Sequence, residues 1–223
     1  MHNVKIRNYQ ADDSMSRLVN ENQDALLVMS RFKIALGFGD KTIGEVCRDN
    51  HVDTNTFLAV INMSDTGFSL VAVMEYLHRS HDYFLNYRLP EIRQKLVRVL
   101  NPGQDELNKA VLGYFDKFEA AVRKHMNYES KKVFPYIQAL LSHEKTEKCP
   151  LIFCKQHEQI ESRLTEFKNI LIKYYPAQST NEMSSVLFDI FSCERDLESH
   201  NAVEDQLYLP AIQELERKNG QPK

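Results

Sequence analysis

Long amphipathic repeats fill most of this chain. Apolar side chains recur at steps of three and four residues, the spacing that places them on one face of an α-helix. This pattern covers four stretches: residues 74–96, 107–140, 153–174 and 186–215. Helix-breaking or polar segments separate them at residues 101–103, 142–150 and 176–180. Four amphipathic helices with short connections predict an all-α fold, an up-down-up-down antiparallel four-helix bundle.

The composition excludes several other classes. Of the 223 residues, 43% are hydrophobic and 26% charged, as in an ordinary globular protein. Seven Gly and seven Pro are too few for a turn-rich β-sandwich. A net charge of −3 without a basic block argues against binding driven by nucleic-acid phosphates. No apolar run approaches the roughly 20 residues of a membrane span. With no secretory leader and four scattered cysteines, we expect a cytoplasmic protein.

The first 65 residues differ from the rest. Shorter helices are predicted over residues 14–32, 42–48 and 54–61, with a Gly37-Phe-Gly39 turn between two of them. Residues 64–67 are typical of a boundary, with an N-cap that opens the first long helix. We therefore expect a small helical N-terminal domain (1–65), the bundle (66–217) and a tail (218–223).

Two His-x-x-x-Glu motifs lie on the apolar stripes of the second and fourth predicted helices. They are His125 to Glu129 and His200 to Glu204, and each Glu is followed six residues later by a proline. A spacing of four places the His and the Glu one above the other on one helix face, about 6 Å apart along the axis. The motifs therefore form an internal repeat whose charged groups face the core.

Distance from the predicted turns places two more histidines at the same height. The midpoint between His81 and His125 is residue 103, and that between His157 and His200 is 178–179, both inside predicted turns. The midpoint between Glu129 and His157 is residue 143, in the middle connection. One inward-facing layer is therefore expected to hold six residues: His81, His125, Glu129, His157, His200 and Glu204.

Such a layer in an apolar core predicts a two-metal centre. An unsatisfied buried carboxylate costs on the order of several kcal/mol, and two divalent cations would remove that cost. Carboxylates can bridge the metals while imidazoles cap them, which suits iron, with manganese or zinc as alternatives. His78 shares the face of His81 and is a seventh ligand, a neighbour of a ligand or a core-edge residue; His2, His51 and His143 are expected at the surface.

This pattern resembles the hemerythrin-like (HHE) domain, and most closely the bacterial di-iron repair-of-iron-centres family. The resemblance covers about 150 residues. It rests on His81 with Leu89-Pro90, His125 and Glu129 with Phe134-Pro135, His157-Glu158, and His200 and Glu204 with Leu209-Pro210. It implies that the six residues ligate two non-haem irons, with the two Glu bridging them. Oxygen carriers of the broader family use five His, whereas four fit the layer here, which weakens an oxygen-storage role.

The N-terminal part departs from the repair family. Where that family carries a Cys-Cys-Gly-Gly-Lys turn, this chain has Gly37-Phe-Gly-Asp-Lys41. Cys47, one or two helical turns later, is at best a partial substitute. Roles that depend on the thiol pair, such as cluster handling or electron delivery, are therefore not implied.

Three functions are compatible with these residues. The first is a di-iron protein that binds or reacts with nitric oxide, oxygen or peroxide, or supplies iron in a stress response; whether it is an enzyme stays open. Its catalytic residues are unknown, with Tyr83, Tyr128 and Tyr208 as candidate proton donors. The second is a ligand-sensing regulator whose N-terminal domain binds a protein or DNA. DNA is disfavoured, because residues 1–64 hold seven Lys or Arg against eight Asp or Glu. The third is a metal-free interaction bundle.

Overall fold

A computed structural model describes residues 8–65, 67–147, 149 and 153–220. The described residues form helices and loops without a β-strand, and a single isolated bridge joins Ser14 to Thr42. The chain divides into two compact units: one takes residues up to 79 together with those from 202 onward, and the other takes residues 80–201. The all-α prediction is confirmed, and the boundary near residue 65 stays a prediction.

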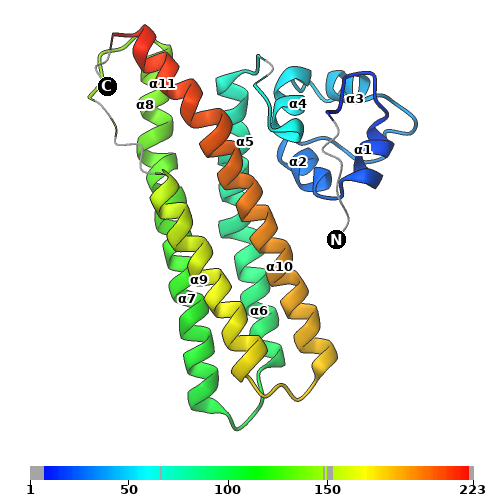
Figure 1. Ribbon diagram of the computed structural model, residues 1–223, viewed down its shortest axis with the longest axis vertical. Helices are drawn as coiled ribbons and strands as arrows, with labels where there is room; N and C mark the ends of the chain where they lie inside the picture. The colour runs from blue at the N-terminus through cyan, green and yellow to red at the C-terminus, as the bar shows by residue number, and fades with distance from the viewer. Residues whose placement is uncertain (1–7, 66, 148, 150–152, 221–223) are drawn as a thin grey trace. The chain divides into compact units, whose positions relative to one another are not determined.

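The bundle helices follow the four predicted stretches, and each stretch forms one long helical segment. Within residues 80–201 the four segments run antiparallel (Figure 1). Three of the four are interrupted by a π-helical turn, labelled η. The segments are α5 (Leu70–Tyr83), η1 (Phe84–Arg88) and α6 (Leu89–Val99); α7 (Asp105–Tyr128), η2 (Glu129–Val133) and α8 (Phe134–Leu141); α9 (Phe153–Tyr174); and α10 (Thr180–Val203), η3 (Glu204–Tyr208) and α11 (Leu209–Lys218).

The three π-helical turns share one sequence cause. Each ends at a residue that is followed by a Leu-Pro or Phe-Pro pair, with the prolines at 90, 135 and 210. Proline has no N–H and its ring clashes with the carbonyl four residues earlier, so a regular α-helix is disfavoured there. The residue before each proline donates its N–H to the carbonyl five residues back, Phe84, Glu129 or Glu204. This i to i+5 bond defines a π-turn.

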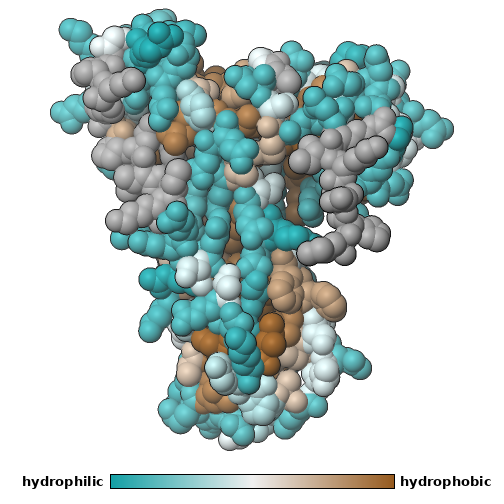
Figure 2. All heavy atoms as spheres, viewed as in Figure 1, coloured by the Kyte–Doolittle hydropathy of each residue, from teal (hydrophilic) through white to brown (hydrophobic). Residues whose placement is uncertain are grey.

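The bundle core is apolar away from the predicted layer. Buried side chains from all four segments contact one another there, among them Leu89, Phe115, Phe167 and Ile190. Hydrophilic residues cover most of the molecular face drawn in Figure 2. Among the described residues, no helix combines the length and the apolar character that crossing a membrane requires.

Two loops at one end of the bundle are joined by hydrogen bonds around Asn101. Its backbone N–H donates to the Tyr175 hydroxyl at 2.6 Å, and its side-chain amide donates to the carbonyl of Pro176. Its side-chain oxygen accepts from the N–H of Gln178 at 3.0 Å, while its own carbonyl accepts from the Asn108 amide at 2.8 Å. These bonds satisfy backbone groups of both predicted turns, and Asn101 is itself buried.

The described N-terminal residues, 8–65, form four short helices instead of the three expected: α1 (Met15–Glu21), α2 (Ala25–Arg31), α3 (Ile43–Asp49) and α4 (Thr54–Asn62). The helix predicted over 14–32 is therefore two helices. Asn22 leaves the helical region (φ −138°, ψ 94°) and its side chain accepts the N–H of Asp24 at 3.2 Å. An Asn side chain that bonds nearby backbone competes with the helical ladder in this way.

Side-chain caps mark the beginnings of α3, α4 and the long helix α5. Thr42 and Glu45 form a reciprocal capping box on α3, and the Asp53 side chain caps α4. The long helix α5 starts at Leu70, and the Ser69 hydroxyl accepts the N–H of Ala72 at 3.3 Å. The cap expected within residues 64–67 is therefore Ser69, a few residues later.

Candidate metal centre

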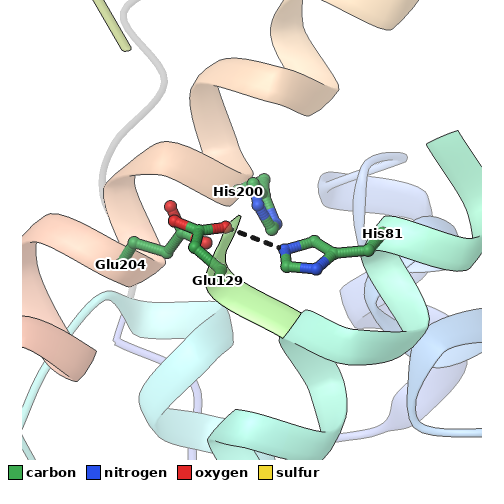
Figure 3. Close-up of side chains that lie close together, drawn as sticks. All are labelled: His81, Glu129, His200 and Glu204. Carbon is green, nitrogen blue, oxygen red and sulfur yellow. Dashed lines mark ion pairs between the residues drawn. The ribbon is translucent and has the colours of Figure 1, made fainter. Parts of the chain in front are cut away.

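The structure brings all six predicted residues together. They fall into two groups that share both glutamates, and the ligand-type atoms within each group lie within 4.8 Å of one another. All six side chains are buried, with Glu129, His200 and Glu204 fully excluded from solvent. The first group holds His81, Glu129, His200 and Glu204 (Figure 3), and the second holds His125, Glu129, His157 and Glu204.

In the first group, imidazoles from α5 and α10 face the carboxylates. His81 Nε2 lies 3.2 Å from Glu129 Oε2, the contact drawn as a dashed line in Figure 3. The His81 and His200 rings meet edge to face, with their centroids 5.3 Å apart. Phe134 stacks on His81 and Phe84 packs edge-on against His200, so aromatic rings hold both imidazoles in place.

In the second group, imidazoles from α7 and α9 converge. His125 Nε2 lies 3.4 Å from Glu129 Oε1 and 3.1 Å from His157 Nε2. The two rings are nearly perpendicular, at 85°. The two oxygens of Glu129 therefore face histidines of different groups, Oε2 toward His81 and Oε1 toward His125. A carboxylate in this arrangement is placed to bridge two cations.

The outward nitrogens of two histidines have hydrogen-bond partners. His81 Nδ1 lies 2.9 Å from Ser130 Oγ, and His125 Nδ1 lies 2.8 Å from Gln156 Oε1. Histidines that bind metals commonly engage their second nitrogen in this way. Sequence reasoning missed Ser130 and Gln156; the only available signal was that each adjoins a predicted ligand, Glu129 or His157.

The backbone explains how the carboxylates enter the layer. Glu129 and Glu204 are each the first residue of a π-turn, one helical turn after His125 and His200. Phe84 is the first residue of η1, so it holds the same position relative to its proline as the two glutamates. The first segment thus places an aromatic ring where the second and fourth place carboxylates.

The remaining histidines lie elsewhere. His78 is exposed and belongs to neither group, so it is not a seventh ligand of this layer or a core-edge residue. His51 and His143 are exposed, as predicted. His2 lies outside the described residues.

The candidate proton donors differ in their surroundings. The Tyr128 hydroxyl lies 3.5 Å from Cys149 Sγ, and burial together with this thiol raises the pKa of Tyr128 to about 12. Tyr208 is fully buried, and Tyr83 packs against Phe84 and Tyr87. Cys47 is buried in the N-terminal part, and burial raises the pKa of its thiol to about 11.

The donor set fits divalent metal ions. Four imidazoles and two carboxylates are the nitrogen and oxygen donors that iron, manganese and zinc accept. Ring nitrogens and carboxylate oxygens approach one another inside a buried layer, where a cation would offset the repulsion between them. The fold and these buried groups define a helical-bundle protein with a site that could hold metal.

Comparison with protein families agrees with this class. Residues 72–212 match the model of the Hemerythrin HHE cation binding domain. This match covers more than half of the chain and includes all six residues of the layer, so the chain belongs to the hemerythrin HHE family. A comparison with curated protein sequences finds no match.

Proposed function

We propose that this chain is a non-haem di-iron protein that binds or reacts with a small ligand such as nitric oxide, oxygen or peroxide, or supplies iron, in a cytoplasmic stress response. One observation carries the proposal: Glu129 directs its two oxygens toward histidines of two different groups, at 3.2 and 3.4 Å. Glu204 belongs to both groups as well. Two carboxylates shared in this way are suited to two adjacent cations.

The proposed roles follow the two groups. His81 and His200 would hold one metal, His125 and His157 the other, and Glu129 and Glu204 would bridge them. Bound ferrous ions would supply electrons and coordination positions for a small ligand. The protein's own contribution is burial: Phe84 and Phe134 pack on the histidine rings and all six side chains are buried, which would exclude bulk water and large substrates.

The finer likeness to the repair-of-iron-centres family is part of the proposal. It is supported by the histidines and glutamates with their Leu-Pro or Phe-Pro pairs, which coincide with the three π-turns. In the N-terminal turn, Gly37 and Gly39 adopt positive φ angles of 91° and 62°, and Phe38 stands between them. Without the cysteine pair of that family, we propose iron supply or ligand binding at the bundle rather than thiol chemistry at this turn.

A sensing role is the second candidate, with the N-terminal helices as the partner-binding element. Arg79, two residues before His81 on α5, donates to the carbonyl of Arg31 at the end of α2 at 3.0 Å. Phe32 also packs against Tyr76 of α5, with ring centroids 5.1 Å apart. A protein partner is favoured over DNA, because Thr56 through Val60 of α4 are buried and offer no side chains to a DNA groove.

Metal analysis of anaerobically purified protein tests the proposal. We expect about two irons per chain, and a new visible absorption after nitric oxide is added. The matched control is His143→Ala, which changes an exposed histidine far from the layer in sequence and should leave the iron content unchanged. Protein that contains no metal and takes up none from added ferrous iron would leave the metal-free interaction bundle as the better account.

A further inference from the structure

We propose that Ser130 and Gln156 are positioning residues, each of which controls one of the two metal positions. The inference rests on the proposed function and extends it to two residues outside the ligand set. Ser130 Oγ lies 2.9 Å from His81 Nδ1, and Gln156 Oε1 lies 2.8 Å from His125 Nδ1. Both positioning residues are half-buried, so water competes only partly for these bonds.

The chemistry follows from the two nitrogens of a neutral imidazole, of which one donates a proton and the other offers a lone pair. Such a ring carries one N–H and one lone pair, and the partner of one nitrogen decides which role the other takes. The Gln156 oxygen is an acceptor only, so His125 Nδ1 donates its proton there and its lone pair stays on Nε2, which faces Glu129 and His157. The Ser130 hydroxyl can accept from His81 Nδ1 in the same way, which would leave the His81 Nε2 lone pair facing Glu129.

Each positioning residue bonds a histidine of the helical segment that precedes its own in the chain. Ser130 of η2 bonds a histidine of α5, and Gln156 of α9 bonds a histidine of α7. Each positioning residue directly adjoins a ligand on its own helix, Glu129 or His157. A small shift of either helix would therefore misplace one of its own ligands and one ligand of the preceding segment together.

The two bonds serve different metal positions. Ser130 orients His81, which is grouped with His200, whereas Gln156 orients His125, which is grouped with His157. Removing one bond should weaken one metal position and leave the other nearly intact. A role limited to general folding stability would weaken both positions together.

Zinc titration of the metal-free protein, followed by calorimetry, tests this assignment. We expect the wild type to bind two zinc ions. Ser130→Ala and Gln156→Met should each weaken one of the two binding steps by about 10- to 100-fold. The matched controls are Ser185→Ala and Gln159→Met, which change exposed residues of the same types on α10 and α9 and should bind like the wild type.

Conservative replacement separates positioning from packing. Gln156→Glu keeps an oxygen acceptor at the same place and should restore both binding steps, whereas Gln156→Met keeps the bulk without the acceptor. In nitrogen-15 spectra of the zinc-loaded protein, the Nδ1 proton of His125 should be visible in the wild type and in Gln156→Glu, and should be lost to exchange in Gln156→Met. If Gln156→Met does not fold, Gln156→Glu alone decides, since weakened zinc binding in that variant overturns the inference.

The outcomes separate this inference from the function on which it rests. A wild type that binds two zinc ions, with variants that bind both as tightly, overturns the positioning roles and leaves the two-metal site in place. Equal weakening of both steps in either variant also overturns the assignment of one residue to each position. A wild type that binds neither zinc nor ferrous iron overturns both proposals.

Discussion

His125 Nε2 lies 3.1 Å from His157 Nε2, so two imidazoles from different helices direct the same ring atom toward one point. In a neutral pair, one of these nitrogens can donate a proton to the other. The nearby Glu129 carboxylate, whose Oε1 lies 3.4 Å from His125 Nε2, adds negative charge at the same point. A bound cation would accept lone pairs from both imidazoles and balance the carboxylate charge. The first two predictions follow from this.

Glu129→Ala should reduce the metal content from about two ions to one or fewer per chain. This carboxylate faces histidines of both groups, so its loss removes a donor from both metal positions. Metal analysis after anaerobic purification measures the effect, and Glu158→Ala is the matched control because Glu158 is exposed and belongs to neither group. Undiminished metal content in Glu129→Ala would contradict the bridging role.

Chelation of the metal should lower the thermal stability of the wild type. A ligand that binds only the folded state at 100 times its Kd stabilises that state by about 2.7 kcal/mol. For a chain of this size, this corresponds to a fall in Tm of roughly 5–10 °C when the metal is removed. Calorimetric scans with and without chelator measure the shift. Glu129→Ala should show a smaller shift, and an equal shift in both proteins would place the stabilising metal elsewhere.

The positions of the six residues could be predicted because the turns fix helix height and the 3.6-residue period fixes the face. The interpretation of His78 as a core-edge residue was wrong, because its side chain is exposed although the three-residue spacing from His81 placed it on the same helix face. The break at Asn22 and the π-turns also escaped prediction, because the break depends on a local hydrogen bond and the π-turns on the prolines that follow them, and neither shows in the helical periodicity.

Ser130 and Gln156 could not be predicted for a related reason. Polar residues beside a buried layer are common, and only the distances from Ser130 Oγ and Gln156 Oε1 to the imidazoles distinguish these two. The capping of α5 by Ser69 is a similar case, because several serine, aspartate and threonine residues precede that helix. The six residues of the layer could therefore be predicted from the sequence, whereas the residues that hydrogen-bond to its histidines could be recognised only in the structure.

Asn101→Ala should destabilise the bundle by about 1–3 kcal/mol, because it removes the two hydrogen bonds by which the buried Asn101 side chain joins its own loop to the loop at residues 176–178. The amide bonds the carbonyl of Pro176 and the N–H of Gln178, and both bonds are lost. Urea unfolding at constant metal content measures the change. Asn169→Ala, which removes one bond within a single helix, should cost less. Equal costs in the two variants would contradict the role of Asn101 in joining the loops.

Cys47 should resist thiol reagents in the folded protein. Burial raises the pKa of this thiol from 9.0 to about 11, so at pH 8 the thiol is protonated and also shielded from solvent. Cys47→Ser should therefore leave the number of thiols labelled at pH 8 unchanged in native protein, and lower it by one after denaturation. Fewer labelled thiols in the native variant would show that Cys47 is accessible.

The raised pKa of Cys47 also determines how the stability of the protein changes with pH. Because the pKa is higher in the folded state, the protonated thiol contributes stability below pH 9, and this contribution declines as the pH rises from about 9 to about 11. Cys47→Ala should show a shallower loss of stability across that window, measured by urea unfolding at stepped pH.

The π-turns also have a consequence for how the chain tolerates changes in length. Each turn contains one residue more than the α-helical path requires, because its hydrogen bond spans five residues instead of four. Three of the four bundle segments thus hold a spare residue at the height of the His and Glu layer, whereas α9 is an unbroken α-helix. A one-residue deletion inside η1, η2 or η3 would preserve the register of the helix that follows, although the proline there disfavours the regular α-helix that results, whereas in α9 it would rotate the rest of the helix by about 100°.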